Sequence, residues 1–524
     1  MKNNINNVRK LPTNLDVPVL KVKTERNGLG VLKTLIIIGL IALQGILFIM
    51  SYLYFMSVFQ YLFFLSLALT LGTCIYVISS NKNSQSKPIW ILFLLVCFSF
   101  GYIMYFISNE KIFWGKNKKK YNAILERSNK TIEKTNLSTK NLCVKNDCEY
   151  LYSVGNFKAY GNTETKYFPS GTQLFDSILD DLSRAKNFIF IEYFIISEGV
   201  LLERMLSILE EKVKNGVMVK IIYDDLGSHG SLKYKTKKRI RRMGIDLKSF
   251  NKLLPKFTPI LNFRDHRKIV IVDGKVGYTG GANLADEYIN EKRMHGYWKD
   301  CGIRLSGDGV NGLTTIFLRQ WEFVSGKTVD YSKYLTKIKD ECSENLVVPF
   351  ADGLEYESNI GKNVYTNMIS SAKEKLYIMT PYFVIDDTIN NLLVNKAKSN
   401  VDVRIILPDI ADKKLVYVVS RNNAEKLVSA GVKIYTMKNS FVHSKIVLNE
   451  NSAVVGSINM DLRSFYQQFE SAVYLTDKIV LNDINKDIEE TINKSYLIDK
   501  SKLKRNKLSY RFFAGMINLI SPFM

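Results

Sequence analysis

Two stretches of the chain, 266–284 and 443–460, repeat one pattern of residues that can do chemistry on an anion. In each stretch a histidine is followed by a lysine two positions later, by an acidic residue seven positions after the histidine, and by a Gly-x-x-Asn sequence. These residues are His266, Lys268, Asp273 and Asn283 in the first stretch and His443, Lys445, Glu450 and Asn459 in the second. Because the chain has only 4 histidines, the repeat indicates one active site built from two halves.

The spacing within each motif suits a β-strand that carries its polar residues on one face. Side chains alternate between the faces of an extended strand, so a histidine and a lysine two positions apart point the same way. A neutral imidazole can attack phosphorus or accept a proton, and a lysine supplies positive charge for phosphate oxygens. Glycines after the strand let backbone N–H groups approach an anion, and the asparagine amide adds a donor. The pattern therefore predicts chemistry at a phosphate group.

A single His-x-Lys beside a buried strand is usually chance, but the sequence around the motif is duplicated too. Three pairs of segments match in the same order: 185–196 with 372–385, 216–225 with 400–409, and 243–247 with 430–434. Strands alternate with amphipathic helices such as 201–216, which is typical of an α/β layer.

We therefore predict an α/β fold with two repeated α/β/α halves, 151–325 and 345–500, joined by a polar linker at 326–344. The halves should associate about a pseudo-two-fold axis. That arrangement would bring His266 and His443 to the same phosphate.

With these motifs the chain resembles the phospholipase D superfamily, whose His-x-Lys-x4-Asp motifs come in pairs, and within it the bacterial cardiolipin synthases. The resemblance extends from about Phe157 to Leu475 and includes the segments EYFII (192–196), DDLGS (224–228), FRDHRK (263–268), TPYF (380–383) and NMDLRSF (459–465). Two positions depart from the family pattern. Glu450 stands where the second motif normally has Asp, and Asp265 stands where Asn usually precedes the first histidine. A glutamate is one methylene longer and can accept the same hydrogen bonds.

The resemblance implies a two-step phosphatidyl transfer that needs no metal and no cofactor. His266 would be the nucleophile that forms a phosphohistidine, and His443 would act first as general acid and then as general base. Lys268, Lys445, Asn283 and Asn459 would hold the non-bridging phosphate oxygens, whereas Asp273 and Glu450 would orient the motifs rather than react. With phosphatidylglycerol as donor and acceptor, the products are cardiolipin and glycerol. The Asp224–Asp225 pair could bind a metal ion, but we expect it to end a strand.

Region 34–110 has the composition of transmembrane helices. No charged residue occurs from Thr34 to Ser80, a length greater than the ~20 residues that one spanning helix needs. We predict about three spans, at 34–56, 60–80 and 88–108, and hence a multi-pass membrane protein; the resemblance implies a bacterial cell membrane. A basic tail (1–33) precedes this region and a basic linker (111–150) follows it.

The charges around these spans give conflicting predictions of orientation. The first 33 residues carry seven Lys or Arg against two acidic residues, and Lys82 and Lys87 follow the second span, so both segments should be cytoplasmic. Three spans would place the two halves outside, yet the chain after the third span is basic as well. A re-entrant third segment would keep catalysis inside. Cys143 and Cys148 could pair if exported or stay reduced if not.

The formal net charge of +23 admits nucleic acid or an anionic membrane surface as partner. The sequence has no recognisable nucleic-acid-binding module, whereas the apolar spans and the basic, apolar C-terminal segment 501–524 favour phosphatidylglycerol and other anionic phospholipids. Three alternatives to a cardiolipin synthase are open: a phospholipase D-type hydrolase, a membrane-tethered nuclease, and a lipid-binding protein without activity.

Overall fold

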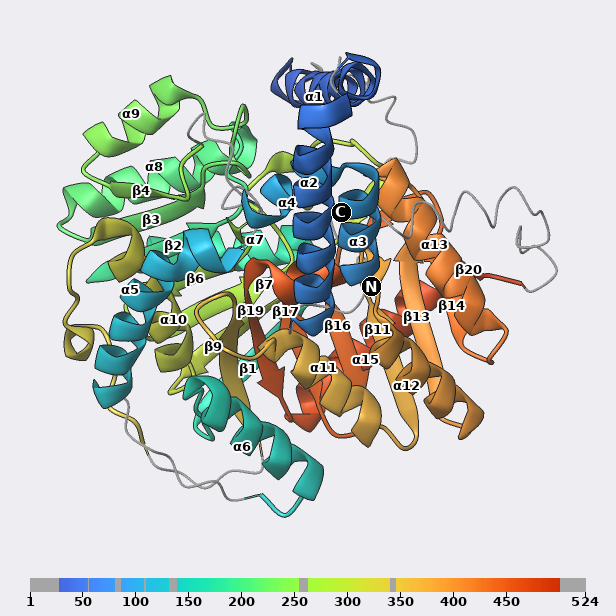
Figure 1. Cartoon of the computed structure of the whole chain (residues 1–524). Coiled ribbons are helices and arrows are strands. Elements are labelled where there is room, and N and C mark those ends of the chain that lie inside the picture. Colours follow the sequence, from blue (N-terminus) through green and yellow to red (C-terminus); the bar gives the residue numbers. More distant parts are fainter. Residues whose placement is uncertain are drawn as a thin grey trace, which may run out of the picture.

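Two mixed β-sheets with the same strand order form the body of the molecule (Figure 1). The computed structural model describes residues 28–54, 56–80, 86–107, 110–131, 139–253, 263–339 and 345–499. The expected C-terminal segment 501–524 and most of the basic tail 1–33 lie outside the described residues.

The first sheet has seven strands, and its inner strands have buried side chains on both faces. In spatial order they are β1 (Thr163–Phe168), β9 (Gly302–Gly307), β7 (Val276–Gly280), β6 (Lys268–Val272), β2 (Phe188–Tyr193), β3 (Met218–Asp224) and β4 (Asp246–Phe250). The runs FIFIEY in β2 and KIVIV in β6 are nearly continuous apolar sequences, as expected of strands covered by helices on both sides.

The second sheet repeats this order and adds one strand at its edge. Its strands are β10 (Val347–Asp352), β19 (Gln468–Leu475), β17 (Ala453–Gly456), β16 (Ile446–Asn449), β11 (Lys375–Met379), β13 (Asp402–Pro408), β14 (Lys433–Met437) and β20 (Ser495–Leu497). In both sheets the first five strands pair antiparallel and the next two pairings are parallel. The predicted duplication of an α/β unit is therefore confirmed in the strand order.

Helices follow corresponding strands in the two halves and cover the sheets (Figure 1). In the first half they are α7 (Gly171–Ser183), α8 (Val200–Lys214), α9 (Tyr234–Arg242) and α10 (Val310–Ser325). In the second half they are α11 (Ile360–Ser371), α12 (Asp387–Lys398), α13 (Lys414–Val428), α14 (Leu462–Tyr466) and α15 (Lys478–Asn493). Local capping sets their starts: Ser170 Oγ accepts from Gln173 N at α7 (3.3 Å), and Asp386 accepts from Ile389 N at α12 (3.1 Å).

Short strands cross between the halves in a reciprocal way. β5 (Arg264–Asp265) of the first half pairs in parallel with β19 of the second, and β15 (Ser440–Val442) of the second pairs in parallel with β8 (Tyr297–Lys299) of the first. In addition, α10 packs against β10, and α15 packs against β1. The smaller elements are β12 (Phe383–Val384), which pairs with β18 (Met460–Asp461), and the 3-10 turns η2 (Asp286–Ile289) and η3 (Tyr331–Lys333).

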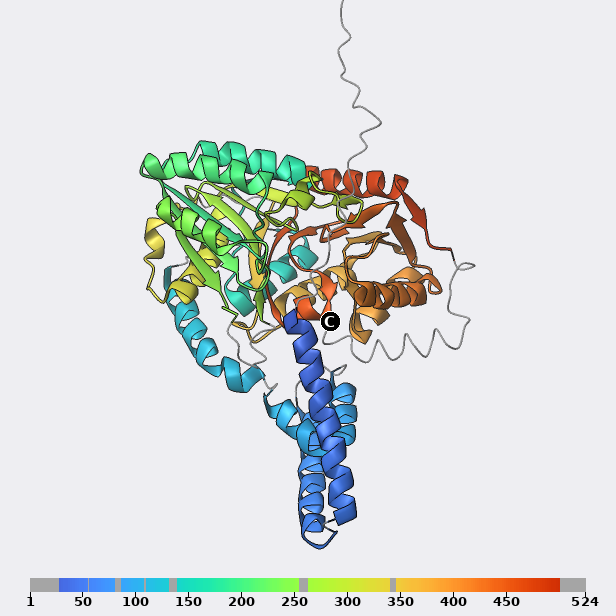
Figure 2. The ribbon, with the colours of Figure 1, turned by 90° about the horizontal axis from the view of Figure 1, so that it is seen from above.

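Helices α1 (Gly28–Tyr54) and α2 (Met56–Ser79) form a stalk that projects from the body (Figure 2). α1 runs away from the body and α2 returns toward it. By length and composition, Gln60–Ser79 is the one segment within the described residues that is long and apolar enough to cross a membrane, and Leu35–Ser51 is a shorter apolar segment. Outward-facing side chains of both helices, such as Leu47 and Leu62, are largely exposed in the isolated chain.

Segment 88–108, expected to be a single spanning helix, is instead an antiparallel pair of short helices, α3 (Lys87–Val96) and α4 (Phe98–Ile107). The chain reverses at Cys97, which brings the rings of Trp90 and Tyr105 to 5.1 Å. A Cβ on Gly101 would lie 3.0 Å from Leu94 Cα, so glycine permits the close approach of the two helices. Each helix has 10 residues, a rise of about 15 Å, which is roughly half of the hydrocarbon thickness.

Segment 111–150, expected to be a basic linker, is largely helical and docked on the body. α5 (Glu110–Thr131) packs against α10, where Lys120 Nζ donates to Phe323 O (2.6 Å) and Arg127 pairs with Glu322. α6 (Leu142–Gly155) packs on α11 and β10 of the second half. Cys143 and Cys148 both lie in α6 as free thiols.

Candidate active site

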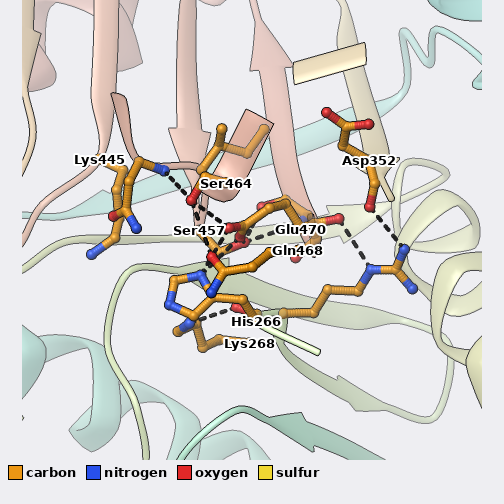
Figure 3. Close-up of polar contacts among 12 residues, drawn as sticks. His266, Lys268, Asp352, Lys445, Ser457, Ser464, Gln468 and Glu470 are labelled. Carbon is orange, nitrogen blue, oxygen red and sulfur yellow. Dashed lines mark hydrogen bonds and ion pairs between the residues drawn. The ribbon is translucent and has the colours of Figure 1, made fainter. Parts of the chain in front are cut away.

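His266 lies between β5 and β6, with its ring held by a carboxylate from the other half. Its Nδ1 is 2.9 Å from Glu470 Oε2, and the Glu470 carboxylate also accepts hydrogen bonds from the hydroxyls of Ser464 (2.7 Å) and Ser457 (Figure 3). Burial and then the neighbouring Lys268 lower the pKa of His266 well below its ordinary value, so the imidazole is neutral. With Nδ1–H donated to Glu470, the Nε2 lone pair is available as a nucleophile.

His443 has the reciprocal arrangement. Its Nδ1 is 2.7 Å from Asp300 Oδ2, and Asp300 belongs to the first half and is fully buried. Lys445 Nζ also lies 2.8 Å from this Nδ1. Because a carboxylate can only accept, we assign the Nδ1 proton to the contact with Asp300. Burial and then Lys445 lower the pKa of His443 to about 4. The ring also packs near the rings of Tyr288 (5.4 Å) and Trp298 (5.5 Å).

The short crossing strands explain why each histidine meets a carboxylate of the other half. Asp265 pairs with Phe469 in β5–β19, His266 N then donates to Phe469 O (2.8 Å), and Glu470 follows directly. The second half repeats this register: Val442 pairs with Lys299, His443 N donates to Lys299 O (2.6 Å), and Asp300 follows. One backbone pattern therefore places a histidine and an acidic residue together at both positions.

The motif lysines lie beneath the histidines. Lys268 Nζ donates to His266 O (2.5 Å), and Lys445 Nζ donates to His443 O. Both side chains are almost completely buried, and burial lowers the pKa of Lys268 to about 7 and that of Lys445 to about 8. Both lysines can therefore gain or lose their positive charge near neutral pH.

The two asparagines of the Gly-x-x-Asn sequences differ in their contacts. Asn283 is engaged at both ends: its Oδ1 accepts from Ile195 N (3.1 Å) and its Nδ2 donates to Tyr288 Oη (2.6 Å). Asn459 is buried, and its Oδ1 has no hydrogen-bond partner among the described residues. The amide of Asn459 can flip so that its NH2 group takes the place of the unbonded oxygen. Asn459 is therefore freer than Asn283 to donate a hydrogen bond to a phosphate oxygen.

Asp273 and Glu450 lie away from the histidines, in the turns at the far ends of β6 and β16. Asp273 accepts from the backbone N–H groups of Lys186, Asn187 and Phe188 at 2.6–2.8 Å, which anchors the start of β2. Glu450 does the same for the start of β11, accepting from Lys373 N (2.9 Å) and Glu374 N (3.4 Å). Each acidic residue therefore ties the turn after its motif strand to the start of the neighbouring strand, and the glutamate of the second motif makes the same kind of contact as the aspartate of the first.

Both histidines line one cavity of about 310 Å³. Its wall includes Asn283 and Asn459, aromatic and aliphatic side chains, and several charged groups from both halves; these wall residues are Phe194, Ile195, Glu287, Tyr288, Met294, His295, Trp298, Tyr382, Val384, Asp412, Lys413, Val416, Phe441, Asp461, Leu462, Arg463 and Gln468. The cavity thus combines two histidines with a mixed polar and apolar surface.

The residues that contact the Nδ1 atoms of the two histidines, Glu470 and Asp300, lie outside the motifs and were not predicted from the sequence. Arg267 was not predicted either. It donates to Glu470 O (3.0 Å) and Asp352 O (3.2 Å) and pairs with Glu355 (2.5 Å), which fixes the first motif onto the second half. The internal repeat could have revealed the two acids, since each follows its Gly-x-x-Asn sequence. Asp300 lies two residues before β9, which pairs with β7, and Glu470 lies within β19, which pairs with β17.

Asp224 ends β3, as expected. Its carboxylate accepts from the backbone N–H groups of Leu226 and Gly227 (both 2.9 Å) and of Asp265 (3.0 Å). The side chain is therefore already committed to the loop that leads into the first motif. Within the described residues no group of three or more metal-ligating side chains occurs.

The amino-acid sequence is similar to those of known proteins. The family pattern described as "Cardiolipin synthase, PLD-like domain" matches residues 178–294 and 365–494. Cardiolipin synthase 1 of Staphylococcus aureus is 32% identical over 470 residues, which cover 86% of this chain and 94% of that protein. Cardiolipin synthase of Oceanobacillus iheyensis is also 32% identical, over 88% of this chain and 97% of its own length.

Among solved structures, phosphatidylserine synthase of Haemophilus influenzae matches with a TM-score of 0.57 and 12% identity, over 73% of this chain and all of that one. At this identity the similarity concerns the fold alone.

Proposed function

This chain belongs to the cardiolipin synthase family, and on that premise we propose that it transfers a phosphatidyl group between two phosphatidylglycerol molecules, giving cardiolipin and glycerol. The two halves act as one unit about a pseudo-two-fold axis. His266 carries the phosphatidyl group between the two steps of the reaction.

In the first step His266 Nε2 attacks the phosphorus of the donor lipid. The P–N bond forms, the P–O bond to the headgroup glycerol breaks, and His443 donates its Nε2 proton to the departing oxygen. His443 is neutral in the empty site, so it gains this proton when the anionic phosphodiester binds beside it and favours the imidazolium. Asp300 stabilises the imidazolium through Nδ1.

In the second step a hydroxyl of the acceptor phosphatidylglycerol attacks the phosphohistidine. His443, left neutral by the first step, takes the hydroxyl proton; the new O–P bond forms and the P–N bond breaks. The enzyme returns to its starting protonation state with cardiolipin as product. Lys268, Lys445 and Asn459 stabilise the negative charge on the non-bridging oxygens in both steps.

One observation carries this proposal: two histidines open onto one cavity, and each has its Nδ1 within hydrogen-bond distance of a buried carboxyl group from the opposite half. A carboxylate on Nδ1 fixes the ring and makes the Nε2 atom more basic. This is what a nucleophile and a proton-transfer group at one phosphorus require.

We extend the proposal to membrane topology. α1 and α2 span the bilayer, whereas the α3–α4 hairpin enters and leaves on the same side. This arrangement places the basic tail, Lys82 and Lys87, and the basic start of α5 all on the side of the catalytic body. The turn between α1 and α2 carries no charge. The positive-inside rule then assigns the active site to the cytoplasm and removes the conflict between the charged segments.

The direct test is incubation of the purified protein with headgroup-labelled phosphatidylglycerol, followed by lipid analysis. Wild type should release labelled glycerol and form cardiolipin, and EDTA should not change the rate. His266→Ala and His443→Ala should both lose cardiolipin formation while remaining folded and in the membrane. Release of glycerol with phosphatidic acid as the sole lipid product would show a hydrolase instead.

A further inference from the structure

The active-site cavity extends from the histidines to a second pair of cations that the two-step mechanism leaves unused. Lys413, at the start of α13, and Arg463, in α14, both line its wall. His266 and Asp461 line the same cavity, so the two cations share it with the nucleophile.

Neither cation is neutralised by a close ion pair within the part of the chain that the structure describes. The Arg463 Nε is buried without a hydrogen-bond acceptor, and Lys413 Nζ lies 5.1 Å from the centre of the Tyr382 ring. Asp461 is occupied as the cap of α14, where it accepts from Ser464 N (2.8 Å), and Asp412 accepts from the Tyr382 hydroxyl. Two cationic donors therefore remain available to a ligand.

The start of α13 adds to this positive character. The helix has 15 residues, Asp412, Lys413 and Val416 from its first turn and approach line the cavity, and no side chain caps its first N–H groups. The N-terminal end of a helix carries partial positive charge that favours an anion. Arg463 of α14 and the start of α13, which carries Lys413, come from separate elements and line the same cavity.

The proposed reaction includes an anion that could bind at this wall of the cavity. The acceptor lipid has its own phosphodiester, which does not react. In the proposed mechanism the donor phosphodiester is bound by the lysines beneath the histidines. We propose that Lys413 and Arg463 bind the unreacting phosphodiester of the acceptor phosphatidylglycerol and thereby select this lipid over water as the acceptor. This assignment rests on the proposed function and specifies how its second step is guided.

The test compares two acceptors that share the donor step. Cardiolipin formation from phosphatidylglycerol needs an acceptor phosphodiester, whereas incorporation of labelled free glycerol into phosphatidylglycerol uses the same phosphohistidine without one. In Lys413→Ala and Arg463→Ala, the ratio of cardiolipin formation to glycerol incorporation should fall about tenfold or more, as expected for loss of a hydrogen bond between charged groups. The apparent KM for phosphatidylglycerol should rise, and Lys413→Arg should restore most of the ratio.

Lys414→Ala is the matched control, because Lys414 is the exposed neighbour of Lys413 and does not line the cavity. It should leave both rates unchanged. An equal fall of the two rates in the Lys413 and Arg463 variants, or no fall in either rate, would overturn the acceptor assignment. A wild-type protein that incorporates glycerol but makes no cardiolipin would instead refute the proposed function itself.

Discussion

The chemistry of single residues in this site depends on carboxylates that the motifs do not contain. Glu470 and Asp300 each hold the Nδ1 of a histidine from the other half. Each carboxylate fixes one tautomer and steadies the imidazolium when it forms. In the proposed mechanism they are positioning residues, because they act on the substrate only through the histidines.

We therefore expect Asp300→Asn and Glu470→Gln to lower kcat by about 100-fold or more while leaving KM within a few-fold, because an amide can support the wrong imidazole tautomer. Glu470→Asp should recover part of the rate. The measurement is steady-state kinetics of cardiolipin formation, with thermal unfolding as a check on folding. Near-normal kcat in both amide variants would contradict the role of the carboxylates.

The buried lysines predict an unusual pH dependence. Burial lowers the pKa of Lys268 to about 7 and that of Lys445 to about 8, so each loses its charge as the pH rises through these values. We expect kcat/KM to fall on the alkaline side with an apparent pKa between 7 and 8, because this ratio reports the free enzyme. The profile of kcat should extend to higher pH, since a bound phosphate favours the charged lysines. A kcat/KM that stays flat to pH 9 would contradict this account.

At the scale of elements, the third apolar segment has a shape that composition alone could not reveal. An apolar run of the right length satisfies a spanning helix and a helical hairpin equally well, because both place apolar side chains in lipid. The reversal at Cys97 depends on packing between Trp90 and Tyr105 and on the close approach at Gly101.

Gly101→Ala should destabilise this hairpin, because the added Cβ would lie 3.0 Å from Leu94 Cα. A cost of about 1–3 kcal/mol is typical of overpacking. Gly72→Ala is the matched control, since a Cβ at this position of α2 meets no atom within 4 Å. Thermal unfolding in detergent should show a lower Tm for Gly101→Ala alone, and equal Tm values for the two variants would contradict the hairpin packing.

Much of the body could be predicted from the sequence, for reasons that are visible in particular elements. The repeated segments became β2 and β11, β3 and β13, and β4 and β14, because their apolar runs demand buried strands. The carboxylates could not be predicted as partners: Glu470 lies 204 positions from His266 and Asp300 lies 143 from His443. Segment 111–150 looked like a linker because its charges are conspicuous, yet Lys120 and Arg127 bind α10.

At the scale of the whole molecule, the topology proposed above places the catalytic body on the cytoplasmic side of the membrane. We expect a cysteine placed at Lys116, at the start of α5, and one placed in the basic tail at Lys10 to be equally shielded from a membrane-impermeant maleimide in intact cells. A cysteine placed at Met56, the first residue of α2, should react. Labelling of the Lys116 position in intact cells would contradict the re-entrant hairpin.

The central claim is that two halves contribute one histidine each to a single site and that His266 carries the transferred group. Its most direct test is rapid quenching of the enzyme with phosphatidylglycerol labelled in the phosphate, followed by mapping of the label on the chain. Our account predicts an acid-labile phosphohistidine at His266, absent in His266→Ala, and no protein-bound label when only the headgroup glycerol is labelled. A stable phosphate adduct on His443, or turnover without any adduct, would contradict it.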